Sequence, residues 1–294
     1  MMMQKLADIV ELIRPYQWYK NLVIFLPIIF GGVLFDFNAF SKTVLGLVSL
    51  CCVSSFNYVI NDIMDKDYDK NHPEKKTRPL ACNKIKIGEA LIVAFLLLLI
   101  SLAIALSLSR YFVLCILALV VLTQLYTFYF KNEVILDIIL IALNFVIRSV
   151  SGAVVILTNN KPYISISSWL ILCTFFLSLF ISVGKRESDL IFLGKNAKKH
   201  KEVLGYYRGS LTQAMMIITT SSLIISYSLY SFLSVYKSII LTLPIAMYAI
   251  FRYLFLIYQG SDIARHPHKI FNDKKITLSA CIWVLFIVIL VYLV

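Results

Sequence analysis

Long apolar runs, separated by short charged segments, recur along the whole chain. About 20 apolar residues in a helix cross the hydrocarbon core of a bilayer, and runs of roughly this length can be placed nine times. They fall at residues 20–36, 43–61, 88–108, 111–130, 134–157, 167–184, 211–233, 238–258 and 276–294. The pattern predicts an all-α polytopic membrane protein with about nine transmembrane helices in a single domain, residues 1–294.

Composition and charge agree with this topology. Hydrophobic residues make up 60% of the chain, against roughly 45–50% in soluble domains. If the N-terminus is inside, 22 of the 28 Lys and Arg residues lie in inner segments and only four in outer loops. The positive-inside rule then predicts a cell (inner) membrane protein whose basic loops face the cytoplasm. The net charge of +12 is therefore a property of that face and does not indicate nucleic-acid binding.

Other sequence signals exclude further classes of protein. The six cysteines are scattered, with no CxxC pair and no histidine at metal spacing, so we expect neither a zinc site nor a disulfide framework. No small-residue cleavage site follows the first apolar run, so we expect that run to be retained as the first span. The sequence predicts no particular oligomeric state.

One stretch, residues 57–80, carries a concentration of oxygen-bearing side chains at the end of an apolar run. If the run continues as a helix at about 100° per residue, five of these side chains share one face, whereas Asp67 points to the opposite side. The five are Asn57, Asn61, Asp62, Asp65 and Asp69. Crowded carboxylates repel one another and need a cation. Mg²⁺ suits such oxygen ligands and commonly bridges them to substrate phosphates.

Basic residues follow this acidic face directly. Lys75, Lys76 and Arg78 can grip phosphate groups from the other side of a bound metal. By charge alone, a second interpretation stays open, in which an acidic helix end is simply followed by a basic juxtamembrane loop.

The fifth apolar run contains an intramembrane charge. Asp137, Asn144 and Arg148 stand at i, i+7 and i+11 and so lie along one helix face. A charge inside the bilayer costs at least ~2.5 kcal/mol. We therefore expect Arg148 to face the bundle interior, paired with a carboxylate or with a substrate phosphate. A purely structural Arg–Asp pair is the alternative.

Three further pairs of polar residues stand at the ends of apolar runs. They are Lys20 and Asn21, Tyr126 and Lys131, and Lys185 and Arg186. Lysine and tyrosine at such positions commonly anchor helices in the interface, but a buried asparagine needs a hydrogen-bond partner. The last charged segment, residues 261–273, has the polar content and proline of a loop and is a candidate lid.

Three sequence patterns carry a family resemblance. Asn61-Asp62-x-x-Asp65-x-x-x-Asp69, followed by Arg78-Pro79-Leu80, resembles the first aspartate-rich motif of the UbiA superfamily of intramembrane prenyltransferases. The run from Arg14-Pro15 to Lys20-Asn21, and Gly184-Lys185-Arg186 followed by an acid, are similar to its decaprenyl-phosphate phosphoribosyltransferase branch. The superfamily's aromatic prenyltransferases carry a second aspartate-rich motif where this chain has Lys185-Arg186.

The resemblance implies helices around a central cavity that opens sideways to the lipid. It also implies Mg²⁺-dependent transfer of a 5-phosphoribosyl group from phosphoribosyl pyrophosphate to a polyprenyl (decaprenyl) phosphate, with pyrophosphate leaving. The implied catalytic residues are Asn61, Asp62, Asp65 and Asp69, with the three aspartates as metal ligands. The implied substrate-binding residues are Lys20, Asn21, Lys75, Lys76, Arg78, Tyr126, Lys131, Asn144, Arg148, Lys185 and Arg186.

Two other functions remain open at this point. One is prenyl transfer from a prenyl diphosphate to an aromatic acceptor such as 4-hydroxybenzoate. The other is a non-catalytic carrier of lipid phosphates, which would leave the clustered carboxylates without a purpose.

Overall fold

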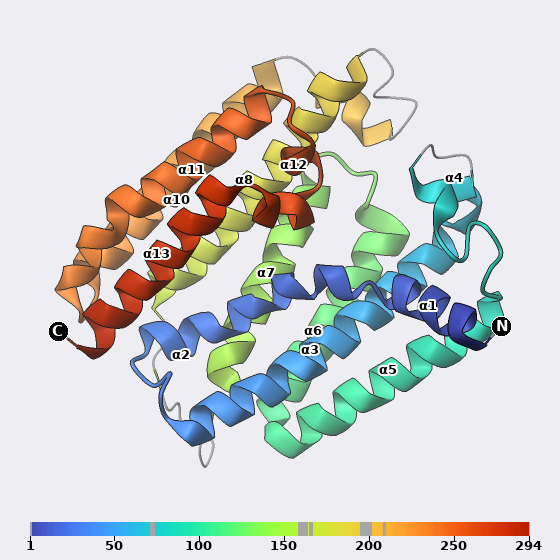
Figure 1. Cartoon of the computed structure of the whole chain (residues 1–294), viewed down its shortest axis with the longest axis horizontal. Coiled ribbons are helices and arrows are strands. Elements are labelled where there is room, and N and C mark those ends of the chain that lie inside the picture. The colour runs from blue at the N-terminus through green and yellow to red at the C-terminus, as the bar shows by residue number, and fades with distance from the viewer. Residues whose placement is uncertain are drawn as a thin grey trace.

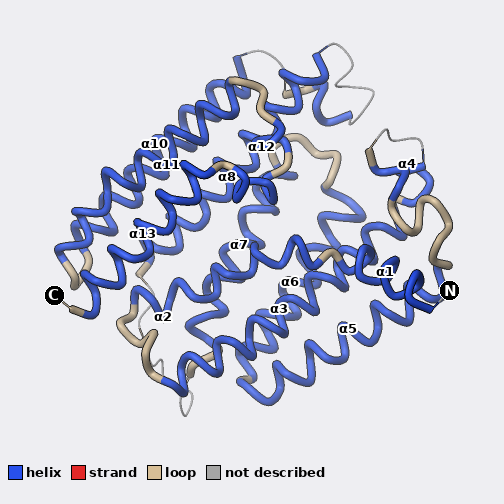
Figure 2. The backbone as a smooth tube through the Cα atoms, in the orientation of Figure 1, coloured by secondary structure: helices blue, strands red, loops and turns tan. Residues whose placement is uncertain are grey.

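A computed structural model describes residues 2–70, 74–157, 164, 167–194, 202–207 and 210–293 (Figure 1). Within these residues the chain is helical and contains no β-strand (Figure 2). Eight helices of the described part are long and apolar enough to cross a membrane. This confirms the all-α membrane architecture.

The eight helices correspond to the second to ninth apolar runs. They are α3 (Phe37–Met64), α5 (Ile87–Leu108), α6 (Arg110–Leu125) with its continuation η3 (Tyr126–Phe130), α7 (Leu136–Val154), α8 (Ser168–Leu193), α10 (Ser210–Leu233), η6 (Lys237–Thr242) with α11 (Leu243–Tyr258), and α13 (Lys274–Tyr292). The count of about nine is approximate because the first run does not form one long helix.

Prolines divide the first part of the chain into three short elements. These are α1 (Met2–Ile13), η1 (Pro15–Phe25) and α2 (Leu26–Phe30). Pro15 and Pro27 each stand in the first turn of a new element, where the missing N–H is tolerated, whereas a proline inside a helix breaks it. The junction residue Arg14 has a left-handed backbone, with φ of 53°. The chain therefore changes direction between α1 and η1.

Helix α7 stands in the middle of the bundle (Figure 1). It packs against η1, α2, α6 and α8, while α3 packs on α5, α8 on α10, and α11 on α13. Helix α7 and η1 approach closely at Gly152, where an added Cβ would lie 1.9 Å from the carbonyl oxygen of Ile24. Only glycine allows the backbones of α7 and η1 to lie this close.

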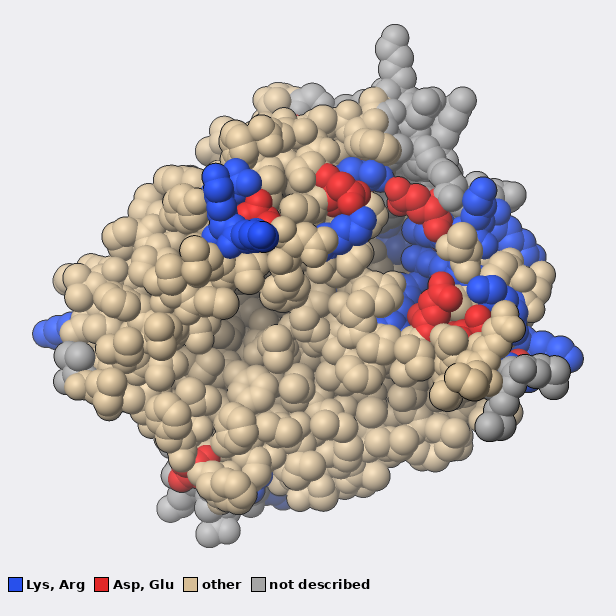
Figure 3. Space-filling view, in the orientation of Figure 1, with Lys and Arg blue, Asp and Glu red and all other residues tan. Residues whose placement is uncertain are grey.

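The outer surface of the bundle is apolar. Helix α5, for example, exposes Ile92, Phe95, Leu96 and Leu99. Charged side chains gather instead toward one end of the molecule, and most of the rest of the visible face has none (Figure 3). That end holds the C-termini of α3, α8 and α11 and the N-termini of α5, α7 and α13.

The candidate lid lies across this charged end as two short elements. They are α12 (Asp262–Arg265) and η7 (Pro267–Asn272). Arg265 is buried and reaches Asp189 of α8 at 3.4 Å and Glu74 of the loop after α4 at 3.3 Å. On the other side, the ring of Phe271 packs edge-on against Tyr19 of η1. The segment thus connects three parts of the charged end.

Candidate active site

The acidic stretch forms the end of α3 and the short helix α4 (Lys66–Lys70). Helix α3 stops at Met64 and Asp65 caps it, so the helix is interrupted for one residue and then resumes. Asp62 and Asp69 remain buried, with 2% and 1% of their surfaces exposed. Asp67 points away: its side chain is 90% exposed and pairs with Lys70 of the same turn.

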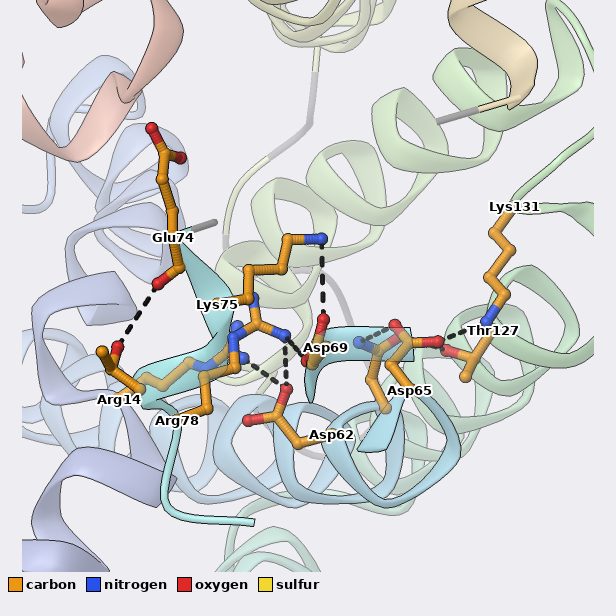
Figure 4. Close-up of polar contacts among 11 residues, drawn as sticks. Arg14, Asp62, Asp65, Asp69, Glu74, Lys75, Arg78, Thr127 and Lys131 are labelled. Atoms are coloured by element: carbon orange, nitrogen blue, oxygen red, sulfur yellow. Dashed lines mark hydrogen bonds and ion pairs between the residues drawn. The ribbon is translucent and has the colours of Figure 1, made fainter. Parts of the chain in front are cut away.

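Basic side chains neutralise the two buried aspartates (Figure 4). Arg78 Nη1 donates to Asp62 Oδ1 at 3.0 Å and to Asp69 Oδ2 at 2.5 Å. The guanidinium of Arg14 forms a second ion pair with Asp62. Asp69 Oδ1 is buried and accepts no hydrogen bond from a described residue, and Lys75 Nζ lies 3.9 Å from it. Burial lowers the pKa of Lys75, and the positive charge of Arg78 lowers that pKa further, against the opposing effect of Asp69.

Asp65 lies in a separate part of the cluster (Figure 4). Lys131 Nζ donates to it at 2.5 Å and Asn61 Nδ2 at 3.0 Å. Thr127 in turn donates to Asn61 Oδ1 at 3.4 Å. Thr127 belongs to η3, a single π-helical turn, and Lys131 follows that turn. Such turns are frequent at functional sites. The end of α6 therefore holds the end of α3 in position.

The fit of this cluster to a divalent metal can be judged from its oxygens. In the part of the chain that the structure describes, no three Asp, Glu, His or Cys side chains converge on one point. The oxygen of Asp69 that lacks a hydrogen bond is nevertheless a free ligand position. Mg²⁺ commonly takes one or two carboxylates and completes its shell with water and phosphate oxygens. The residues present fit that mode of binding, and joint ligation by all three aspartates remains a prediction.

A second group of charges faces the interior without carboxylate partners. Lys20 of η1 and Arg148 of α7 form no ion pair with any described residue. Lys185 of α8 lies close to Lys20, but its side chain is exposed and its charge interacts with that of Asp189, one turn further along α8. Arg148 is only 9% exposed, its Nε has no acceptor, and its guanidinium lies 5.4 Å from the ring centre of Phe145. Lys20 is close enough to Arg148, and Lys185 to Lys20, for their charges to interact. This group has an excess of positive charge.

Arg186, next to Lys185 in sequence, is in a different environment. Its Nη2 donates at 2.7 Å to Asp137, which is fully buried at the start of α7. The hydroxyl of Tyr207 also donates to Asp137, at 2.6 Å, and accepts from the backbone N–H of Ile135 at 2.8 Å. The structural Arg–Asp pair considered from the sequence for Arg148 is therefore formed by Arg186 instead.

Comparison with known proteins identifies the family of this chain. The model of the UbiA prenyltransferase family matches residues 24–272. The chain belongs to the UbiA prenyltransferase family. This confirms the resemblance drawn from the acidic motif, and the protein is a membrane transferase.

Individual relatives and solved structures are similar to this chain over nearly its whole length. The chain is 28% identical over 303 residues to the decaprenyl-phosphate phosphoribosyltransferase of Corynebacterium glutamicum, covering 99% of this chain and 89% of that protein. It is 27% identical to the Mycobacterium tuberculosis protein of the same name, covering 95% and 92%. The fold matches that of a UbiA homolog from Archaeoglobus fulgidus bound to GPP and Mg²⁺, with a TM-score of 0.70 at 19% identity, covering 97% and 99% of the two chains.

The remaining predicted site residues make contacts outside the two groups of charges. Asn21 is buried, and its amide bonds to Cys51 and Ser54 and so joins η1 to α3. Asn144 accepts from Thr123 at 3.0 Å, between α6 and α7. Tyr126 lies close to the charges of Arg186 and Asp137. Lys76, the last predicted site residue, is exposed and forms no ion pair with a described residue.

The structure brings to the site four residues that were not proposed as site residues from the sequence, although Arg14 and Asp137 stood in the patterns described there. They are Arg14, Tyr58, Asp137 and Tyr207. The arginine–proline step before η1 was a usable signal for Arg14, and its guanidinium lies 5.4 Å from the ring centre of Tyr58. Tyr207 gave no such signal, because its contact with Asp137 joins residues 70 positions apart.

Proposed function

We propose that the protein transfers the 5-phosphoribosyl group of phosphoribosyl pyrophosphate to a polyprenyl phosphate and releases pyrophosphate. The excess of cations carries this proposal. Basic residues already neutralise the acidic cluster, yet Lys20 and Arg148 form no ion pair with a described carboxylate, and Lys185 stands beside them with only the charge of Asp189 nearby. A prenyl diphosphate brings only its diphosphate, whereas this donor and acceptor bring a pyrophosphate, a 5-phosphate and a lipid phosphate. The names of the curated relatives support the same reaction.

The chemistry of the proposal needs charge stabilisation and positioning. A Mg²⁺ ion held at Asp69, with Asp62 or Asp65, would supply neutralisation of the departing pyrophosphate. Arg78 and Lys75 stand beside that position. The bond between ribose C1 and the pyrophosphate oxygen breaks with its electron pair on the oxygen, and an acceptor phosphate oxygen forms the new bond to C1. The protein contributes preorganised charges rather than a nucleophile.

A two-arm assay tests the proposal. Purified protein with Mg²⁺ receives radiolabelled phosphoribosyl pyrophosphate and a polyprenyl phosphate, and label is expected in the lipid phase. In the second arm it receives a prenyl diphosphate and 4-hydroxybenzoate, and no prenylated product is expected. Product in the second arm alone would establish the aromatic prenyltransferase function instead. Product in neither arm would remove support for both reactions.

We further propose that the whole chain forms one domain in the cytoplasmic membrane with the site facing the cytoplasm. Two exposed residues report on this orientation: Lys76, in the charged segment between α4 and α5, and Lys237, in the connection between α10 and α11 at the opposite end of the bundle. A cysteine at position 76 should react with an impermeant thiol reagent only from the cytoplasmic side, and one at position 237 only from outside, in a background without exposed native cysteines. Labelling of both from one side would contradict the topology. Lys161 and Lys195, also suited to this test by sequence, lie outside the described residues.

A further inference from the structure

Lys20 and Arg148 lie side by side because of the way η1 packs on α7. The contact between Gly152 and the Ile24 carbonyl brings the two backbones together. Lys20 precedes Ile24 by four residues and Arg148 precedes Gly152 by four residues, so both side chains lie about one turn from the contact, on its cytoplasmic side. The two charges are close enough to interact.

This pair of cations lies well below the acidic cluster. Arg148 stands twelve residues after Leu136 in α7, which is about 18 Å along the helix axis. It interacts electrostatically with Cys51 and Tyr58 of α3. Asp62, by contrast, is two residues from the end of α3. Measured along α3, the Lys20–Arg148 pair therefore lies between about one and three turns deeper in the bundle than Asp62, because Tyr58 and Cys51 precede Asp62 by four and eleven residues.

The pair also lacks an anion of its own. No described carboxylate pairs with either residue, and Arg148 Nε has no acceptor. A charge at this depth is expensive unless an anion compensates it. A phosphate monoester carries a charge of about −1.5 to −2 at pH 7. Its charge matches that of the two cations together.

We infer that Lys20 and Arg148 bind the phosphate of the lipid acceptor, whereas the cations around the acidic cluster bind the soluble donor. This inference rests on the proposed function, and it assigns one substrate to each set of cations. A soluble donor enters from the charged end, where Lys75, Arg78 and Lys131 stand. A lipid phosphate keeps its tail in the bilayer and so reaches a cationic pair deeper in the bundle from the side.

Direct binding tests the inference without turnover. The protein in lipid nanodiscs is titrated with labelled polyprenyl phosphate, and with the uncharged polyprenol as reference, in the absence of donor. Wild type should prefer the phosphate. Lys20→Gln and Arg148→Lys should each reduce that preference at least tenfold, because a lysine lacks the bidentate fork of arginine, and should leave polyprenol binding unchanged. Arg252→Lys is the matched control, since Arg252 also lies in a span but pairs with Asp273 at 2.8 Å.

Kinetics provide the second measurement and separate the possible failures. The same two variants should raise the KM for polyprenyl phosphate about tenfold and that for phosphoribosyl pyrophosphate less than twofold. The inference is overturned if the KM for the donor rises instead, because the pair would then hold the donor's 5-phosphate. It is also overturned if phosphate preference in the binding assay is unchanged. If wild type binds polyprenyl phosphate through these residues but transfers no ribosyl group, the proposed reaction fails while the lipid-phosphate site stands. Should Arg148→Lys unfold, Lys20→Gln decides alone.

Discussion

Two groups of charges within one bundle are built on opposite principles. In the acidic cluster each carboxylate has at least one basic partner: Asp62 and Asp69 share Arg78, and Asp65 pairs with Lys131. In the interior group, Lys20 and Arg148 have no such partner among the described residues. The first group is balanced without a ligand, and the second is balanced only when an anion arrives.

This difference in charge balance indicates how each group binds its substrate. Arginine side chains that bridge carboxylates keep their positions, so a metal–phosphate complex meets a preorganised surface. Unpaired cations at depth gain most from an anion because little solvent screens them. The interior group thus favours phosphate binding more strongly than any exposed lysine can.

Removing a carboxylate from the balanced group should have the largest effect. Asp69→Asn removes the charge beside the open oxygen position, and Asp65→Asn removes the partner of Lys131. Loss of metal-assisted charge stabilisation is worth several kcal/mol, so kcat should fall by about 100-fold or more in either variant. Turnover under saturating Mg²⁺ measures the change.

Asp67→Asn provides the control for this prediction. Asp67 is exposed and pairs with Lys70, and surface ion pairs contribute about 0–1 kcal/mol. Its activity should therefore stay close to that of wild type. Equal losses at positions 65, 67 and 69 would contradict the division of the helix into a site face and a solvent face.

Two neighbouring residues of the second region should give unlike results. Lys185→Ala removes an exposed cation that forms no ion pair with a described residue, so the KM for phosphoribosyl pyrophosphate should rise about tenfold while thermal stability is kept. Arg186→Ala leaves Asp137 buried without its arginine, and breaking such a pair typically costs about 3–5 kcal/mol. Its main effect should appear in the unfolding temperature. If both variants raised KM equally at unchanged stability, the structural role of Arg186 would be wrong.

Local periodicity was sufficient for much of this architecture. The second to ninth apolar runs each became a long helix, and the helical face at Asn61, Asp62 and Asp65 was readable from spacing alone. The first run was not, because Pro27 starts a new element inside it. A hydropathy window records apolar content and not the lost backbone donor of a proline.

Long-range pairing was the part that the sequence did not contain. Lys185 and Arg186 are adjacent and chemically alike, yet they point about 100° apart around α8 and meet different neighbours. Which of them meets Asp137 depends on how α7 packs on α8, and on Tyr207 from a loop that returns to Ile135. Ile135 adopts φ of 71°, which is costly for a β-branched residue. The hydrogen bond from its N–H to Tyr207 helps to hold that conformation.

The smallest expected effect concerns pH at the boundary between the two groups. Burial, and after it the charge of Arg78, lowers the pKa of Lys75 below that of a free lysine, about 10.4. Below this lowered pKa the ammonium is present and attracts the donor's phosphates, and as the pH rises through it the charge is lost. The KM for phosphoribosyl pyrophosphate should therefore rise by a few fold on the alkaline side, at a pH below 10.4. Lys75→Arg, which stays charged throughout, should flatten this rise, and the KM for the lipid acceptor should follow the same course in both proteins. A wild-type profile that Lys75→Arg leaves unchanged would remove Lys75 from donor binding.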